Sequence, residues 1–267
     1  MKEYQIFKTK DAVPGPGSRH AVEVVAGRNP SLGVQHYRIP NVSGVHEIDI
    51  NLGEGARLEM VIEQATSAEV ESLSRVRVKA GSDSALKLTV ILDGGAKSAF
   101  EIDTSVEGRG ARIELRGLLN AKARQQFSIR ADAVHSVSDT YSDLQVWCAA
   151  RDESRTVFNG RIHILQSAPR TEAFQKNRNL MLSKHATVDS FPKLLIENDE
   201  VKCAHGSSTS SLEPEQTYYL QARGIDPETA EAMMLKGFLR QPLEWISDVS
   251  IRHEIESRLG VLEEEWS

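Results

Sequence analysis

The sequence has few cysteines, no long apolar run and no basic cluster, and each absence excludes a class of protein. Its two cysteines, Cys148 and Cys203, are too far apart for a C-x-x-C redox or metal motif. No apolar run reaches the roughly 20 residues that span a bilayer, and the opening stretch "MKEYQIFKTKDAVPGPG" lacks the apolar segment of a signal peptide. We therefore predict a cytoplasmic protein with free thiols and no membrane partner.

The chain also lacks a basic surface and the common catalytic motifs. Its net charge is −6, and its lysines and arginines are scattered among acids, so nucleic acid is not an expected partner. It contains no G-x-x-x-x-G-K-[ST] and no G-x-G-x-x-G that opens a helix, so we expect no nucleotide site in this chain. G-x-S-x-G and H-E-x-x-H are missing too, which removes two familiar hydrolase sites.

What the sequence does have is short alternating runs of apolar and polar residues from about Val45 to Val201. Runs such as "RLEMVIE", "SRVRVKA" and "ARIELRGLL" predict strands, and clusters such as "NLGEG" and "LDGGA" predict turns between them. "GARLE" at 55–59 reappears as "GARIE" at 110–114, which indicates a structural repeat. The periodicity alone is compatible with a sandwich, a barrel or a β-solenoid.

The two ends of the chain differ from this alternating part, 45–212. Residues 1–44 are rich in glycine and proline, and we expect them to form an extended lead-in. Residues 213–267 have helical periodicity and form a predicted C-terminal helical region. The division predicts one β-rich unit with a helical appendage.

Three helices are predicted in the C-terminal region. The first lies in "EPEQTYYLQARG" and ends at Gly224. The second begins with Asp226 as N-cap and Pro227 at the first helical position, and the third is expected over 242–259, before Gly260. The second helix places several apolar side chains on one face, which fits docking on its own domain and fits an adaptable partner surface equally well.

Cys203 and His205 are the strongest candidate site residues. They lie two apart on a predicted strand and so point to the same face, about 7 Å apart at their Cα atoms. Thiolate and imidazole are ligands of zinc, copper and iron–sulfur species, but a tetrahedral site needs about four ligands, so another strand, another chain or the cargo has to supply the rest. The simpler alternative is a half-buried thiol beside a surface histidine.

Other candidates are weaker. Cys148 alternates with apolar neighbours, so we interpret it as a core thiol. His163 in "GRIHIL" is expected to face away from the two flanking isoleucines. Glu197, Asp199 and Glu200 resemble the paired acids of glycoside chemistry, although a solvated acidic turn explains them as well. The few aromatic residues argue against a sugar-binding cleft.

Residues 157–240 resemble the C-terminal core of the SufB/SufD family, the scaffold proteins of the SUF iron–sulfur cluster assembly system. The resemblance rests on "GRIHI", "NRNLMLS", P-x-L-x-I, "DEVKCAHG", EQ-x-YYL-x-ARGI and A-x-x-M-x-x-KGF, in this order and without large gaps. The chain is more similar to the SufD branch, which typically has K-C-S-H-G where this sequence has "KCAHG".

The resemblance implies a mainly β fold, a right-handed parallel β-helix followed by a small helical region. It implies a scaffold that carries a transient iron–sulfur cluster and is not itself an enzyme. His205 occupies the place of a histidine near the interface between two scaffold subunits, and Cys203 matches the SufD-type cysteine beside it. The helical tail resembles the region that docks the ABC-type ATPase SufC, which makes these residues candidate partner contacts: Ala230, Met233, Met234, Lys236, Phe238 and Arg240.

Two departures from the family pattern keep alternatives open. Asn177 stands where SufB has an essential cysteine, and the N-terminal helical domain of longer members is missing from this sequence, as expected of a minimal member. The working dimer is therefore either a homodimer or a heterodimer with a SufB-like subunit that supplies the cysteine. The remaining hypotheses are a structural or regulatory module that binds SufC without cluster chemistry and a solenoid enzyme that acts on polysaccharide.

Overall fold

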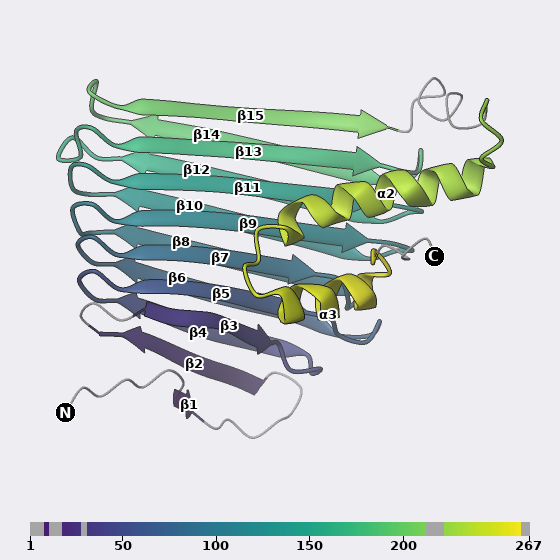
Figure 1. Ribbon diagram of the computed structural model, residues 1–267, viewed down its shortest axis with the longest axis horizontal. Helices are drawn as coiled ribbons and strands as arrows, with labels where there is room; N and C mark the ends of the chain where they lie inside the picture. Colours follow the sequence, from purple (N-terminus) through teal and green to yellow (C-terminus); the bar gives the residue numbers. More distant parts are fainter. Residues whose placement is uncertain (1–7, 11–17, 28–30, 212–221, 263–267) are drawn as a thin grey trace.

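The chain folds into a parallel β-solenoid, in which each coil contributes one strand to each of two facing sheets (Figure 1). The computed structural model describes residues 8–10, 18–27, 31–211 and 222–262. Sheet A has eight strands in the order β1-β2-β4-β6-β8-β10-β12-β14, and sheet B has seven in the order β15-β13-β11-β9-β7-β5-β3. Neighbouring strands are parallel except for β1 on β2. The predicted solenoid is confirmed, and a sandwich or barrel is excluded.

The strands of both sheets are short and nearly equal in length, as a regular coil requires. Sheet A contains β1 (Lys8–Lys10), β2 (Ser18–Ala26), β4 (Gly44–Leu52), β6 (Glu71–Ala80), β8 (Lys97–Val106), β10 (Gln126–His135), β12 (Arg155–Ile164) and β14 (Thr187–Ile196). Sheet B contains β3 (Ser31–Arg38), β5 (Arg57–Gln64), β7 (Ala85–Leu92), β9 (Arg112–Ala121), β11 (Tyr141–Ala150), β13 (Glu172–Met181) and β15 (Lys202–Ser211).

The β-rich part begins earlier than the expected residue 45. β1 pairs with β2, β2 with β4 and β3 with β5, so three strands of the lead-in already belong to the sheets. Val22, Val24 and Ala26 are buried and alternate with less buried residues, as in the later strands. Pro40 follows β3 and does not interrupt a strand, so the proline content of this segment was a misleading signal.

The repeated pentapeptide marks equivalent positions in two coils. Arg57 is in register with Ala85, and Ala85 is in register with Arg112, so "GARLE" and "GARIE" lie two coils apart on sheet B. Gly55 and Gly110 have φ values of 67° and 76°, the left-handed backbone that glycine adopts without steric cost. The sequence repeat is thus a repeated turn that leads into the strand.

The inner faces of the two sheets form the main hydrophobic core. In sheet A, Ile129 is in register with Phe100 on one side and with Phe158 on the other, and all three side chains are buried. Parallel in-register strands place equivalent side chains about 4.8 Å apart, so these groups stack into a column along the solenoid axis. Apolar columns of this kind hold successive coils together.

The inner face of sheet B changes from apolar to polar toward the C-terminal coils. One column runs Met60, Leu88, Leu115, Leu144, Gln175 and His205. A second runs Ile62, Val90, Gly117, Val146, Asn177 and Ser207. In both columns the change occurs at β13, and this is the first structural sign that the last coils differ from the rest.

Two helices lie on the outer face of sheet B (Figure 1). α2 (Pro227–Leu243) has Asp226 as N-cap, whose side chain accepts from Thr229 N, and proline at its first position, as predicted. α3 (Val249–Leu259) ends at Gly260 in the left-handed conformation, also as predicted. The first predicted helix falls mainly on 212–221, outside the described residues. In the described part of the chain, neither helix is long and apolar enough to cross a membrane.

The expected start of the last helix at Pro242 is wrong. Pro242 lies in the last turn of α2, where it is buried, and α3 begins only after Asp248. The side chain of Asp248 accepts hydrogen bonds from Ser250 N and Ile251 N and satisfies the free N–H groups of the new helix. An N-cap inside a continuous helical pattern was the signal for this break.

The helices bury a second hydrophobic cluster against sheet B. Its members come from β5, β7, β9, β11 and the helical region: Val61, Ile91, Leu118, Trp147, Ala149, Leu239, Leu243, Ile246, Ile255 and Val261. Trp147 Nε1 also donates to Gln241 Oε1 at 3.2 Å. The apolar side of α2 therefore packs on its own domain.

Buried Glu63 ties α3 to the first coils. Its carboxylate lies 3.0 Å from His36 Nε2 and 3.4 Å from Arg38 Nε, and it also pairs with Arg258 of α3. A buried carboxylate requires such partners because its desolvation is costly. The end of the chain is thus anchored at the opposite end of the stack from β15.

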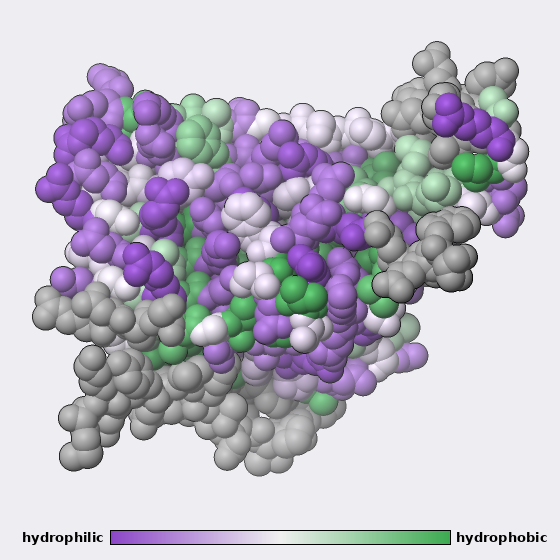
Figure 2. Space-filling model, viewed as in Figure 1, coloured by the Kyte–Doolittle hydropathy of each residue, from purple (hydrophilic) through white to green (hydrophobic). Residues whose placement is uncertain are grey.

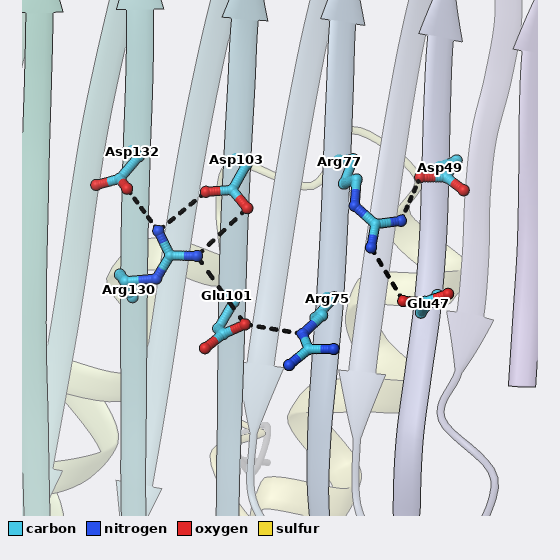
Figure 3. Close-up of polar contacts among 8 residues, drawn as sticks. All are labelled: Glu47, Asp49, Arg75, Arg77, Glu101, Asp103, Arg130 and Asp132. Atoms are coloured by element: carbon cyan, nitrogen blue, oxygen red, sulfur yellow. Dashed lines mark hydrogen bonds and ion pairs between the residues drawn. The ribbon is translucent and has the colours of Figure 1, made fainter. Parts of the chain in front are cut away.

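The outer face of sheet A carries ion pairs (Figure 3). Arg77 bridges Glu47 at 2.9 Å and Asp49 at 3.2 Å on β4, while Arg130 reaches Asp103 at 2.9 Å on β8. Opposite charges directly across neighbouring strands are favourable, but each exposed pair contributes little. These charges lie on β4 to β10, whereas β14 places exposed Phe191 and Leu195 on the same face.

Candidate functional site

The C-terminal end of the stack is open. β14 pairs only with β12, and β15 pairs only with β13, so in the described ranges no strand covers their outer edges. Phe191 and Leu195 of β14 are 51% and 48% exposed. Unpaired edge backbone and exposed apolar side chains are features of a surface that pairs with another chain.

Cys203 and His205 lie on the inner face of this last coil. Cys203 is in register with buried Ala173 and His205 with buried Gln175, and side chains of in-register parallel strands share a face. The predicted common face of the pair is confirmed. Cys203 is half-buried against a small cluster that includes Ile162 and Ile164, whereas His205 is exposed because no further coil covers it.

The thiol of Cys203 is not activated by its surroundings. Burial raises its pKa, and the hydrogen bond from the backbone of Ala173 opposes this only in part. The sulfur is therefore protonated at neutral pH and becomes a thiolate ligand when a cation or a partner charge displaces the proton. A soft metal brought to this coil would supply that charge.

The chain alone does not complete a metal site. Across the part of the chain that the structure describes, no group of three or more His, Cys, Asp or Glu side chains could hold a metal ion. Cys203 and His205 have the donor chemistry of a zinc or iron ligand set but provide only two of about four ligands. A metal bound at this pair would need further ligands that the described residues do not bring together.

Cys148 is a core thiol, as predicted, and lies far from Cys203. It is fully buried on β11, and burial raises its pKa to about 12. Its column contains Thr209 of β15, six positions after Cys203, which corresponds to roughly 20 Å along the strand. The two thiols do not act together in this fold.

Asn177 is buried beside Cys148 and is built into the interior. Its Nδ2 donates to Val146 O at 3.1 Å and lies 3.7 Å from Cys148 Sγ. Ser207 occupies the next position in its column. The position where the family resemblance expects a SufB cysteine is thus an amide that faces the polar inner layer.

The acidic turn is used for contacts between coils. His163 Nε2 lies 2.6 Å from Glu197 Oε1, and this contact lowers the pKa of Glu197. Asp199 and Glu200 line a hollow of about 620 Å³ together with ion-paired Asp139 and Arg170. The carboxylates that resembled a glycosidase pair therefore lie in a turn that joins coils.

The candidate partner residues on α2 fall into two groups. Ala230 is buried, and Phe238 packs against the cluster under the helices. Met233 is 49% exposed and Lys236 is exposed, while Met234 and Arg240 are half-buried. Figure 2 shows paler, apolar surface at the projecting end of α2. Ala232 is exposed there too, and its small side chain gave no signal in the sequence.

The sequence interpretation also missed the amides of β13. Gln175, Asn177 and Asn179 are buried on the inner face, and each retains a side-chain oxygen without a hydrogen-bond partner. In "QKNRN" the inward and the outward residues are all polar, so the pattern indicates a strand with both faces in solvent and gives no sign of burial. Only the pairing of the strands reveals that Gln175 lies under His205, and Asn177 and Asn179 under Ser207 and Thr209.

Comparisons with known proteins agree with this architecture. A family model described as SUF system FeS cluster assembly, SufBD core domain, matches residues 11–238. The chain is 29% identical over 167 residues to the iron-sulfur cluster assembly protein SufD of Escherichia coli (strain K12), which covers 62% of this chain and 40% of that protein. It is 30% identical over 208 residues to a SufBD family protein of Mycobacterium leprae (strain TN), a match that covers 75% of this chain and 53% of that protein. It is 28% identical over 178 residues to SufD of Bacillus subtilis (strain 168), which covers 67% of this chain and 41% of that protein. The chain thus spans about half the length of these relatives or less.

Proposed function

The chain belongs to the SufBD family of the SUF iron–sulfur cluster assembly system, and on this premise we propose that it is a scaffold subunit that holds a nascent iron–sulfur cluster. The cluster is cargo, assembled and passed on. The protein works in the cytoplasm and has no nucleotide site of its own. An ABC-type ATPase of the SufC kind supplies the energy, so the chain is a scaffold and not an enzyme.

The observation that carries this proposal is the placement of Cys203 and His205. Two soft donors share the inner face of the last coil, which no further strand of the described residues covers. Iron–sulfur species take thiolate and imidazole ligands. An incomplete ligand pair at an uncovered end suits a transient cluster that a second subunit helps to hold and then releases.

The proposed partners use two separate surfaces. A second scaffold subunit, either another copy of this chain or a SufB-like protein, meets the open edges of β14 and β15 and completes the ligand set. The ATPase meets the projecting end of α2, where Met233 and Lys236 are exposed. Ala230, Met234, Phe238 and Arg240 lie on the more buried sides of the same helix.

One observation favours a second candidate function. Asn177 is fully buried and its amide is hydrogen-bonded inside the solenoid, so that position has neither a thiol nor access to solvent. A chain of this kind is also compatible with a structural or regulatory SufBD module that binds the ATPase but has no cluster chemistry. Metal content separates the two functions.

The test is anaerobic co-purification of the full chain with the SufC-type ATPase of the same organism, with and without a SufB-like subunit. Stoichiometry is read by light scattering, and iron and acid-labile sulfide are measured in the same sample. A complex with iron and sulfide supports the scaffold function. A complex that stays free of iron even with a SufB-like subunit supports the regulatory module, and the absence of any complex contradicts both.

Two single-residue variants sharpen this test. His205→Ala is expected to lose most of the iron and sulfide while the chain stays folded, because an exposed histidine contributes little packing. His185→Ala, which changes another exposed histidine in the turn between β13 and β14, serves as the matched control and retains both. Equal iron content in the two variants would contradict the assigned role of His205.

A further inference from the structure

Gln175 ends a run of four apolar residues in its column, which begins at Gln35 of β3. In the inner face of sheet B it follows Met60, Leu88, Leu115 and Leu144, and the next and last member of the column is His205. Burial of an amide where leucine stands in the three preceding coils is costly unless its donor and its acceptor find partners. Apolar packing therefore does not explain why an amide stands at this position.

The side-chain N–H of Gln175 donates a hydrogen bond, whereas its side-chain oxygen has no hydrogen-bond partner. Gln175 Nε2 points across the interior to Gly160 O of β12 at 3.5 Å. Gly160 makes room for it, since a Cβ at that position would lie 2.5 Å from Gln175 Nε2. Gln175 Oε1 is buried and has no hydrogen-bond partner, although the residue is only 2% exposed.

The amide cannot simply be reversed. With oxygen and nitrogen exchanged, Gln175 Oε1 would face the carbonyl oxygen of Gly160, and two acceptors would oppose each other. The free oxygen therefore needs a donor from another residue of the inner layer. The residue in register on the only neighbouring strand toward the open end is His205.

We propose that Gln175 is a positioning residue for His205: its Oε1 accepts a hydrogen bond from one ring N–H of His205 and directs the other ring nitrogen out of the open end. In-register side chains lie about 4.8 Å apart at the backbone, within reach of a rotation of the exposed imidazole. A neutral imidazole that donates from one nitrogen presents the other as a ligand. This inference rests on the proposed function only for its consequence, metal binding, and not for the hydrogen bond itself.

The neighbouring amide provides a matched control. Asn179 lies two inward positions further along β13, is buried to the same degree and has an unpartnered Oδ1. Its Nδ2 donates to Thr209 Oγ1 at 3.2 Å, so it serves another residue of β15. A change at Asn179 perturbs the same polar layer without touching the Gln175–His205 column.

The experiment measures the tautomer of His205 in the full chain by NMR with ring-¹⁵N-labelled histidine, at about pH 8.5, two units above the usual histidine pKa. The His205 signals are identified among the eight histidines by comparison with His205→Ala. We expect a single tautomer in the wild type. Gln175→Met, which is similar in size but has no acceptor oxygen, is expected to show a mixture of both tautomers.

Two further variants complete the design. Gln175→Glu retains an acceptor oxygen and is expected to keep the single tautomer, and Asn179→Leu is expected to keep it as well. In a parallel titration with Co²⁺, followed by the thiolate-to-metal charge-transfer band, Gln175→Met is expected to bind about tenfold more weakly than the wild type. Asn179→Leu is expected to bind as the wild type does.

The outcomes distinguish this inference from the function on which it builds. A mixture of tautomers in the wild type overturns the positioning role without the need for any variant. A single tautomer that persists in Gln175→Met overturns it too. A wild-type chain that has a single tautomer, lost in Gln175→Met, but binds neither Co²⁺ nor iron supports the role of Gln175 and contradicts the proposed function.

Discussion

The two ends of the solenoid are built from the same coil but treat their inner faces differently. Near the first end, the inner positions of β5 are Leu58, Met60 and Ile62, all buried. Beyond them β3 adds Gln35 and Tyr37 to two of these columns, and antiparallel β1 pairs with part of β2. In the last coil the equivalent columns end in Cys203, His205 and Ser207, and no strand of the described chain pairs beyond β15. The parallel pairing is the same in both regions, so the side chains of the inner columns distinguish the apolar coils from the polar last coil.

This difference shows how a repetitive fold acquires a site. Most inward positions are apolar where a coil lies on both sides, because desolvation of polar groups is costly, and the buried amides of β13 are the exception. At the last coil that requirement ends, and polar or ligating residues become admissible on the same inward positions. The site needs no special loop; it is the interior of the solenoid, exposed where the stack stops.

Thiol reactivity is expected to show the largest contrast between interior and open end. Cys148 is fully buried, and burial raises its pKa to about 12, so it reacts only when the protein opens, on the order of a thousandfold more slowly than half-buried Cys203. Alkylation with iodoacetamide, followed by mass spectrometry, measures both rates. Both rise with pH because the thiolate is the nucleophile. Comparable rates at the two thiols would mean that the interior near Cys148 is open.

Two alanine substitutions in one column are expected to differ by about 3 kcal/mol. Leu115→Ala leaves a cavity in the middle of the stack and should lower the free energy of unfolding by about 3 kcal/mol. His205→Ala, at the end of the same column, should cost less than about 0.5 kcal/mol because the residue is exposed. Urea denaturation measures both. A large loss in His205→Ala would show that the open end contributes to stability.

The pH dependence of stability is expected to reflect the buried His135. Burial lowers the pKa of His135 to about 4, and its ring nitrogens bond to Thr140 and Ser142. The unfolded chain binds the proton near pH 6.5, so the free energy of unfolding should fall by roughly 2 kcal/mol as the pH drops from about 6.5 to about 4. His135→Gln should flatten this dependence, which His185→Gln should leave in place. An unchanged slope in His135→Gln would assign the pH effect to another group.

The smallest effect is expected on the outer face of sheet A, which belongs to neither end. Arg77→Gln removes ion pairs to Glu47 and Asp49 that are partly exposed, so we expect a loss of roughly 0.5 kcal/mol. The loss should shrink in about 1 M salt, where exposed charges are screened. Urea denaturation at low and high salt measures this. A loss that is independent of salt would point to packing of the Arg77 stem.

Local patterns in the sequence were sufficient for the strands, for the shared face of Cys203 and His205, and for the start of α2 at Asp226 and Pro227. Each of these depends on residues within a few positions of one another. The family resemblance was needed to choose the solenoid among the all-β folds, because alternation is the same in each of them.

Features that depend on distant residues were not predictable. Gln175 and His205 are neighbours only because β13 and β15 pair in register, a full coil apart in sequence. The early strands β2 and β3 are stabilised by their pairing with β4 and β5, which outweighs the proline-rich composition around them. The break before α3 is different, because its signal, Asp248 as N-cap to Ser250 and Ile251, is local and was overlooked.

The anchorage of the helical region has a mechanical consequence. The amino-terminal end of α2 projects beyond the stack (Figure 1), while Trp147 contacts Gln241 near the carboxy-terminal end of α2 and buried Glu63 pairs with Arg258 of α3. Because α2 and α3 are each held to the solenoid by one of these contacts, a force on the free end of α2 is transmitted to the whole solenoid. Force applied at the projecting end would therefore rotate the solenoid as one piece and swing its open end through an arc.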